Sequence, residues 1–281
     1  NKNYDLQVIA DDLAGNVLIP PTATSVRYDI SPPFSGPLSP ANGAFLRQLP
    51  EITGTALDPN SNPSTVAGSQ LKIQRSDGQY WTGATWGAET WLTGVAGNSW
   101  TKNTQLPPAD NLTGLIDGAL YTIQTRSYDI AANTQTVYLA GNSFRFDVSS
   151  PTAFIELPLN GSRNISLPLV SGTASDAFNV NFPQIRVYDG QSAKYWMEGS
   201  GTCGVGNNLP GWVDAACPSF PEIWNVAQGS AAAGGIFSWN YDSASLAWDN
   251  RDNQLRVEAK VTDRAGNYSV ASSTFSFDNV L

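Results

Sequence analysis

The residues from Leu120 to Asp147 alternate between hydrophobic and polar types in a way that predicts a β-hairpin. Successive residues of the first arm, 121–127, fall alternately on its two faces. The turn at 129–133 is rich in residues that bond their own backbone. Residues 136–146 form the return arm, and the closing aspartate ends the unit.

This hairpin pattern occurs three times in the 281 residues. Each copy has an alternating arm, a turn that runs from Asp to Asn, and a return arm that closes on Asp. The three copies span 4–29, 121–147 and 255–278. Their closing residues, Asp29, Asp147 and Asp278, lie more than ~100 residues apart, which indicates domains rather than solenoid repeats of about 20–50 residues.

The segments between the hairpins also repeat. LPEITGTALD at 49–58 matches LPLVSGTASD at 167–176, and a Tyr-Trp pair follows in each repeat, at 80–81 and at 195–196. The sequence therefore predicts three parts: residues 1–29 are the final hairpin of a preceding repeat, 30–147 are one complete repeat, and 148–281 are a second complete repeat with a Cys-containing loop insertion.

Residues 1–29 hold only a hairpin, and a two-stranded hairpin alone is marginally stable in water. We expect it to pair with something outside this sequence. One alternative is that the sequence is cut from a longer chain, and the other is that the hairpin completes a sandwich in another subunit by strand complementation. Proline-containing linkers at 31–33 and 149–151 predict stiff junctions and an elongated, end-to-end arrangement.

Short strands alternate with turns rich in Gly, Pro, Ser and Asn, and long helical periodicity is missing, so the predicted fold class is all-β. A strand is expected over 51–57, with Ile52, Gly54 and Ala56 in alternation, and Leu71 and Ile73 are expected to face the interior of the first complete repeat. Asp117 and Tyr121 are spaced as in the tyrosine corner of Ig-like sandwiches, where the hydroxyl binds the entering loop. Strands in the second repeat are expected near 153–157, 167–174, 183–189, 194–198, 236–241, 246–248, 254–263 and 269–278.

The Asp-x-Ala-Gly-Asn turn, the Phe-x-Phe-Asp ending, the proline that follows it and the Tyr-Trp pair together resemble bacterial Ig-like (Big-type) repeats, in a tryptophan-rich variant. The resemblance implies tandem Ig-like β-sandwiches, two of them complete and one partial, of the kind that occur in large extracellular surface adhesins. It also implies rods or fibres outside the cell, often with calcium at the domain junctions.

Composition excludes several partners. The net charge is −9, only 14% of the residues are charged, and the sequence has no histidine. An acidic chain repels phosphate groups, so we expect no nucleic-acid partner, and anionic membranes are also disfavoured. The sequence has no apolar run of transmembrane length, so we expect no membrane insertion in this segment. Acidity suits divalent cations, but it also serves solubility alone.

Aspartate and asparagine occur both in the hairpin turns and at the closing positions. Hard cations such as calcium take six to eight oxygen ligands, so these residues are candidate metal ligands. The alternative is that they only shape the turn, where the other copies have Gly15 and Gly266 at the position of Ala132. The alanine predicts a tighter or strained turn. The candidate ligands are Asp12, Asn16 and Asp29 at one junction, Asp129, Asn133 and Asp147 at the next, and Asp263, Asn267 and Asp278 at the third.

Eight of the nine tryptophans fall into two groups. Those at matching places in the two repeats are predicted to fill the sandwich cores, and they are Trp81, Trp100, Trp196 and Trp239. Those in less regular segments are candidates for loop plugs, inter-chain contacts or contacts with a surface glycan, and they are Trp86, Trp91, Trp212 and Trp224.

Cys203 and Cys217 lie in one Gly/Pro-rich loop that the first repeat lacks. Closing a loop of about 15 residues would contribute roughly 3 kcal/mol in the chain-entropy model. We expect a disulfide, and therefore an oxidising compartment. Two free thiols are the alternative. The cysteine spacing and the absence of histidine disfavour zinc.

We expect no enzymatic activity, because no histidine is present to activate a serine or cysteine, and the carboxylate pairs that exist form no recognisable catalytic arrangement. The leading hypothesis is a structural segment of a long extracellular or cell-surface repeat protein that forms a rod, filament or adhesin stalk. Its partners would be copies of itself or neighbouring repeats. The alternatives are a carbohydrate-binding module that uses the loop tryptophans and a non-catalytic appendage of a secreted enzyme.

Overall fold

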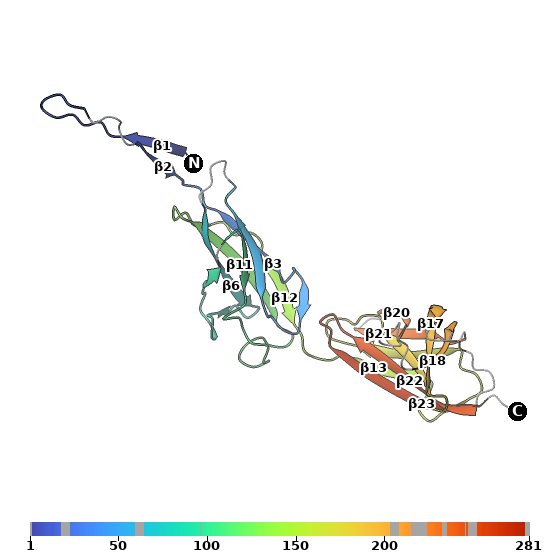
Figure 1. The fold of residues 1–281 in the computed structure, drawn as a ribbon. Helices are drawn as coiled ribbons and strands as arrows, with labels where there is room; N and C mark the ends of the chain where they lie inside the picture. Colours follow the sequence, from blue (N-terminus) through green and yellow to red (C-terminus); the bar gives the residue numbers. More distant parts are fainter. Residues whose placement is uncertain are drawn as a thin grey trace. The chain divides into compact units, whose positions relative to one another are not determined.

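The structure, a computed structural model, describes residues 2–17, 23–59, 65–95, 97–202, 208–214, 224–231, 235–244, 246 and 252–278. The regular structure in these ranges is β-strand, which confirms the all-β prediction. The chain divides into two compact units, residues 1–147 and 148–281 (Figure 1). No helix in the described ranges is long and apolar enough to cross a membrane.

The first unit begins with a hairpin of two strands, β1 (Lys2–Gln7) and β2 (Ala23–Tyr28), drawn in dark blue in Figure 1. The strands pair antiparallel, from Lys2 opposite Tyr28 to Gln7 opposite Ala23. Every residue of both strands is exposed. Within the described residues, the hairpin is therefore held by its backbone bonds and its turn rather than by a core.

Two sheets form the rest of the first unit. The smaller sheet has the order β10–β5–β3 and consists of β3 (Phe34–Ser39), β5 (Ile52–Leu57) and β10 (Ser99–Lys102). The larger sheet has the order β4–β12–β11–β6–β7–β8 and consists of β4 (Ala44–Leu46), β6 (Val66–Arg75), β7 (Tyr80–Trp81), β8 (Trp86–Gly87), β11 (Leu120–Asp129) and β12 (Asn142–Phe146), with β9 (Leu92–Val95) also paired to β6. β4 runs parallel to β12, and the other pairs are antiparallel.

The core of this sandwich lies between the two sheets, because alternate residues of each strand point inward. Ile52 of the smaller sheet is completely buried, as are Leu71, Ile73, Ile123 and Phe144 of the larger sheet. The predicted inward orientation of Leu71 and Ile73 is confirmed.

Tyr121 forms the predicted tyrosine corner. Its hydroxyl accepts a hydrogen bond from the backbone nitrogen of Ile116 at 2.7 Å, and its ring stacks on Phe144 with centroids 5.2 Å apart. Burial raises the pKa of the Tyr121 phenol. Leu255 stands at the aligned position of the second unit, completely buried, and it has no hydroxyl to bind the entering loop.

The second unit repeats this architecture. Its four-stranded sheet has the order β13–β15–β21–β20 and consists of β13 (Thr152–Leu157), β15 (Leu169–Ser175), β20 (Gln228–Ala231) and β21 (Ile236–Asp242). Its larger sheet has the order β14–β23–β22–β16–β17–β18 and consists of β14 (Arg163–Asn164), β16 (Gln184–Asp189), β17 (Lys194–Thr202), β18 (Asn208–Asp214), β22 (Asp252–Thr262) and β23 (Tyr268–Asp278), with β19 (Asn225–Val226) also paired to β16. Both units are Ig-like β-sandwiches.

Most of the strands predicted for the second repeat are present, as β13, β15, β16, β17, β21, β22 and β23. The strand predicted near 246–248 is not seen at Leu246, the described residue of that range, which lies outside any strand. β14, β18, β19 and β20 were not predicted. Two of these strands have only two residues, and the other two lie in a Gly-rich insertion with little alternation.

The final hairpins of the two units differ. β22 and β23 pair along their whole length, from Asp252 opposite Asp278 to Thr262 opposite Tyr268. β11 pairs with β12 only from Leu120 to Ile123. The prediction that the return arm starts near residue 136 is therefore wrong, since strand β12 starts later.

The side chain of Gln135 explains why the return arm starts late. Gln135 is buried, and its Oε1 accepts hydrogen bonds from the backbone nitrogens of Ser35 at 2.9 Å and Ser127 at 3.2 Å. This side chain satisfies backbone groups at the end of β11 that a neighbouring strand would otherwise bind. The chain rejoins the sheet at Asn142, whose Nδ2 donates to the carbonyl oxygen of Pro40 at 2.9 Å.

Candidate metal centre

Three aspartates converge in the first unit where the chain leaves the hairpin. Asp29 follows β2, Asp58 follows β5, and Asp129 ends β11. All three side chains are buried, and one carboxylate oxygen from each lies within 4.8 Å of the others. We call these three residues the carboxylate trio.

The hairpin turn holds one member of the trio in place. The backbone nitrogen of Asn133 donates to Asp129 Oδ1 and its Nδ2 donates to Asp129 Oδ2, both at 2.9 Å. The same Nδ2 also donates to the carbonyl oxygen of Asp29 at 3.0 Å. Asn133 therefore fixes the carboxylate of Asp129 and ties the turn to the segment that enters the sandwich.

The trio concentrates negative charge away from water. Two ionised carboxylates at such a separation repel each other by about 3 kcal/mol at an effective dielectric constant of about 20. A hard cation suits the trio because three carboxylates supply three to six of the six to eight oxygens that calcium takes, and backbone oxygens and water can supply the others.

The sequence named two of the three carboxylates as candidate ligands but assigned them to different junctions, whereas the structure brings them together. Asp29 and Asp129 were among the candidate ligands, and Asp58 was missed. The repeat itself could have pointed to Asp58, because Asp58 aligns with Asp176 and both aspartates follow equivalent strands. Sequence spacing alone did not show that the end of β5 meets the end of β11.

Asn133 plays a different part from the one predicted. Its amide nitrogen, rather than its amide oxygen, faces the carboxylate of Asp129. The same pairing recurs in the other turns, where Asn16 Nδ2 donates to Asp12 Oδ2 at 2.7 Å and Asn267 Nδ2 donates to Asp263 Oδ2 at 2.8 Å. The hydrogen bonds from Asn16 lower the pKa of the Asp12 carboxyl. Each asparagine therefore shapes its turn, as the alternative interpretation holds.

The remaining candidate ligands lie elsewhere. The repeat aligns Asp147, Asp176 and Asp263 with the trio of the first unit. Asp263 is buried and Asp278 is exposed at the end of β23. The exposed Asp12 belongs to the turn of the first hairpin.

The four core tryptophans are buried, as predicted: Trp81, Trp100, Trp196 and Trp239 are each at most 4% exposed. The other four prove to be equivalent in pairs. Trp86 lies opposite Trp81, and Trp212 lies opposite Trp196, in matching strand pairs. Trp91 directly precedes Leu92, which pairs with Leu71 of β6. Trp224 directly precedes Asn225, which pairs with Ile185 of β16, and Ile185 aligns with Leu71. These tryptophans therefore belong to the repeat rather than to irregular loops.

Trp86 packs against the core of the first unit. Its Nε1 donates to the carbonyl oxygen of Gly114 at 2.8 Å. The Trp81 ring lies 5.3 Å from it, and the Arg75 guanidinium lies 4.7 Å from its centroid. Trp212 packs in the same way on the core of the second unit, with its ring 5.8 Å from that of Trp196.

Cations cover the other two indoles. Arg126 lies 4.3 Å and Lys72 lies 4.9 Å from the centroid of Trp91. In the second unit, Arg186 lies 4.5 Å and Lys260 lies 5.6 Å from the centroid of Trp224. Cation–π contacts of this kind contribute about 0.5–2 kcal/mol.

The cation pairs come from aligned positions on two neighbouring strands of each unit. Lys72 aligns with Arg186, and Arg126 aligns with Lys260. A carboxylate accompanies each cluster: Lys72 binds Glu89 at 2.7 Å, and Arg186 binds Glu258. The outer face of each larger sheet thus carries the same cation–aromatic cluster with different side chains.

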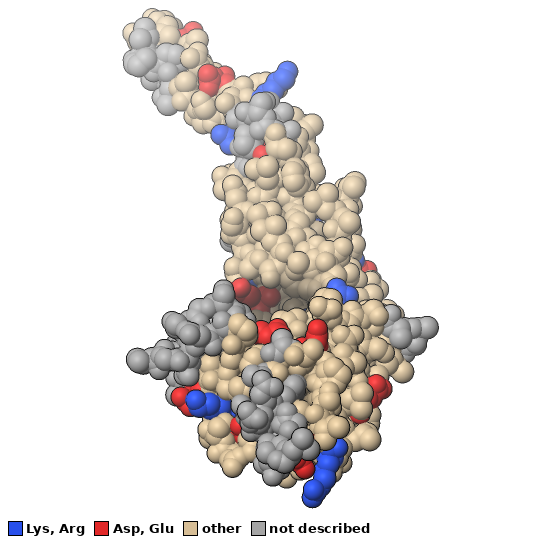
Figure 2. Space-filling view, turned by 90° about the vertical axis from the view of Figure 1, so that its right-hand side faces the viewer, with Lys and Arg blue, Asp and Glu red and all other residues tan. Residues whose placement is uncertain are grey.

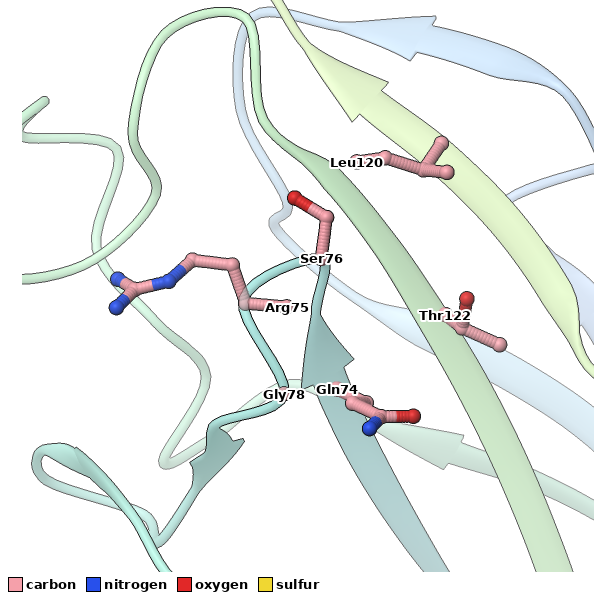
Figure 3. A pocket seen from close by; sticks show the side chains of 6 residues that line it. All are labelled: Gln74, Arg75, Ser76, Gly78, Leu120 and Thr122. Atoms are coloured by element: carbon pink, nitrogen blue, oxygen red, sulfur yellow. The ribbon is translucent and has the colours of Figure 1, made fainter.

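Cys203 and Cys217 lie outside the described residues, so the disulfide stays a prediction. A hollow of about 180 Å³ lies at the end of β6 beside β11, and it is lined by Gln74, Arg75, Ser76, Gly78, Leu120 and Thr122 (Figure 3). The Arg75 side chain points away from Leu120 and Thr122 in this view, and it binds Asp77 at 2.6 Å. The hollow gathers none of the predicted site residues.

Charged side chains are sparse on the face shown in Figure 2, where Lys and Arg (blue) and Asp and Glu (red) are scattered over a much larger uncharged area. This distribution agrees with the low charged fraction of 14%. The face in view offers no continuous basic surface of the kind that binds phosphate backbones.

Neither a comparison with models of known protein families nor a comparison with curated protein sequences finds a match. Solved structures that are similar include fibronectin(III)-like modules of Clostridium thermocellum CbhA, with 11% identity, a TM-score of 0.39, and coverage of 87% of this chain and 94% of that one. The FN1–FN3 domains of chicken CNTN1 share 12% identity, with a TM-score of 0.40 and coverage of 98% and 75%. A tetra-tandem repeat in the extending region of a large adhesion protein shares 18% identity, with a TM-score of 0.32 and coverage of 99% and 57%.

Proposed function

We propose that this chain is a non-catalytic structural segment of a long extracellular repeat protein, forming a rod, filament or adhesin stalk at the cell surface. We further propose that the carboxylate trio binds calcium. The observation that carries the proposal is the trio itself, since buried carboxylates converge where the chain enters the first sandwich. The partners of such a segment are neighbouring repeats or copies of the chain.

A cation at the trio would join three separate segments. Asp29 lies on the entering chain, Asp58 follows a strand of the smaller sheet, and Asp129 ends a strand of the larger sheet. Binding all three would hold the entering chain against both sheets. Such a bond stiffens the entrance to the sandwich, and stiffness is the property that a rod or stalk requires.

The tryptophans also favour a structural role over a carbohydrate-binding module. A sugar platform needs exposed, free indole faces, whereas Trp91 and Trp224 are half-buried and contact cations of their own unit. Trp86 and Trp212 pack against the cores. The absence of histidine and the tandem architecture agree with a structural role.

Thermal unfolding of the full chain, with calcium and with a chelator, tests the proposal. Methyl NMR signals of Ile73 report the first unit separately from signals of Val257 in the second. Saturation at about 100 times the dissociation constant should stabilise the first unit by about 2.7 kcal/mol. Asp58→Asn should abolish the calcium response, because it removes one of the three converging carboxylates.

Asp214→Asn is the matched control, since it removes the same charge from an exposed position in the second unit. It should leave the calcium response of Ile73 intact. Magnesium should have a weaker effect, because it demands octahedral geometry and dehydrates reluctantly. An Ile73 transition that is indifferent to calcium in the unmodified chain would contradict the proposal.

A further inference from the structure

The hairpin β1–β2 presents an apolar face to solvent. Tyr4 lies opposite Val26 in the antiparallel register, and Leu6 and Tyr28 extend the same face at either end. These side chains are 48%, 43%, 57% and 55% exposed, respectively. The Tyr4 and Tyr28 rings contact each other edge to face, with centroids 6.5 Å apart.

The two other copies of this hairpin bury the same positions. Counting back from the turn aspartate, Tyr4 aligns with Tyr121 and Leu255, and Leu6 aligns with Ile123 and Val257. Counting back from the closing aspartate, Val26 aligns with Phe144 and Phe275, and Tyr28 aligns with Phe146 and Phe277. The eight aligned residues of the complete units are at most 1% exposed.

The complete units also show what covers this face. An antiparallel strand pairs with the first arm of the hairpin, as β6 does with β11 and β16 does with β22. A short parallel strand pairs with the return arm, as β4 does with β12 and β14 does with β23. A second sheet packs over the apolar side chains. Neither edge of β1–β2 pairs with another strand in the part of the chain that the structure describes. These two edges and the apolar face therefore call for the same three elements.

The hairpin is already shaped for such a partner. Its turn has the backbone bonds of the other copies: Asp12 N donates to Asn16 O at 3.0 Å, as Asp129 N does to Asn133 O at 3.1 Å. Its two strands pair in register over six residue pairs, although no core covers them. A preformed partner loses less conformational entropy on docking than a disordered one.

We infer that β1–β2 is the docking surface for an Ig-like sandwich of this same repeat type that lacks its own final hairpin. The hairpin supplies the last two strands of that sandwich, with Tyr4, Leu6, Val26 and Tyr28 entering its core. The partner must supply a strand for each edge of the hairpin and a second sheet to cover its apolar face. A flat apolar surface or a single added strand would not supply all three.

Two extended chains test this inference, each containing residues 2–281. In the first, residues 30–118 are joined directly before Lys2, so that Tyr4 takes the position of Tyr121. In the second, residues 148–252 are joined there, so that Tyr4 takes the position of Leu255. Hydrogen exchange of the Leu6 and Val26 amides should be at least about a hundredfold slower in an extended chain than in the unmodified chain, because buried strands open only on unfolding.

Leu6→Asp together with Val26→Asp provides the control, since carboxylates on this face cannot enter an apolar core. These substitutions should return exchange in the extended chains to the rate of the unmodified chain. The inference is overturned if the hairpin amides exchange equally fast in both extended chains and in the unmodified chain, while the Val257 amide of the same molecules stays protected.

Discussion

Glycine stands opposite a core tryptophan in both sandwiches. Gly54 of β5 faces Trp100, and Gly172 of β15 faces Trp239. A methyl group built on Gly54 would lie 2.1 Å from a ring carbon of Trp100, and one on Gly172 would lie 2.3 Å from Trp239. The indole can lie against the neighbouring strand only because no side chain is there.

This packing predicts the effect of a single methyl group. Gly54→Ala should destabilise the first unit by about 1–3 kcal/mol, the usual cost of overpacking a core. Gly36→Ala is the control on the neighbouring strand, because its methyl group would meet only Leu139 at an ordinary 3.6 Å. Urea unfolding followed through the Ile73 methyl signal measures both changes. Equal effects of the two substitutions would contradict the packing argument.

The turn of the first complete repeat is strained at Ala132, as the sequence predicted. Its φ is 68°, whereas the aligned Gly15 and Gly266 have φ of 84° and 90°. A Cβ atom in this left-handed region costs roughly 1–2 kcal/mol, and the flexibility of glycine in the unfolded chain offsets part of any relief. Ala132→Gly should therefore stabilise the first unit by up to about 1 kcal/mol.

Gly266→Ala is the reverse substitution in the second unit and should destabilise that unit by about 1 kcal/mol. Urea unfolding followed at Ile73 and Val257 separates the two effects. The strain argument fails if Ala132→Gly weakens the first unit.

Lys102 is a buried cation in the first sandwich, at the position that Tyr241 holds in the second. Its Nζ donates to the carbonyl oxygen of Thr93 at 2.9 Å and to Gln105 Oε1 at 3.1 Å, and burial lowers its pKa. In the unfolded state the lysine pKa is about 10.4, so between the folded-state pKa and this value the folded protein binds fewer protons than the unfolded protein. The free energy of unfolding therefore rises as the pH rises through this interval.

We therefore expect the first unit to gain stability relative to a Lys102→Met variant as the pH is raised towards the unfolded-state pKa of about 10.4. Urea unfolding at a series of pH values, followed at Ile73, measures this difference. Parallel pH dependences of the two proteins would show that Lys102 does not titrate between these states.

Residue types alone predicted part of the carboxylate trio. Asp29 stood out because it closes a hairpin outside the turn, and Asp129 stood out as a repeated turn residue. Asp58 follows a strand of the opposite sheet, so only the pairing of strands across the sandwich brings it to the other two. Sequence does not show which atom of an amide faces a carboxylate, and in Asn133 it is the amide nitrogen rather than the oxygen.

At the scale of elements, alternation predicted the long strands well. Strands such as β11, β22 and β23 have one buried and one partly exposed face, so their period of two is visible in the sequence. The two-residue strands β14 and β19 are too short to show a period. The return arm after Asn133 was misjudged because Gln135, a polar residue, is buried there in place of a paired strand.

At the scale of the whole chain, repetition carries more information than any motif. The two units share the order of their sheets, their core tryptophans and their cation-covered indoles, although the residues differ. Sequence comparison aligned the core tryptophans directly. It did not align Trp91 with Trp224, because the insertions between them and the Tyr-Trp pairs differ in length.

The paired indoles give each unit its own optical label. Trp81 and Trp86 lie 5.3 Å apart at 61° in the first unit, and Trp196 and Trp212 lie 5.8 Å apart at 68° in the second. Two chromophores held this close and at such angles couple their electronic transitions, and each pair should produce an exciton couplet in circular dichroism. Replacing Trp86 with Phe would silence one couplet and leave the other, so the folding of either repeat could be followed in the intact chain without any added probe.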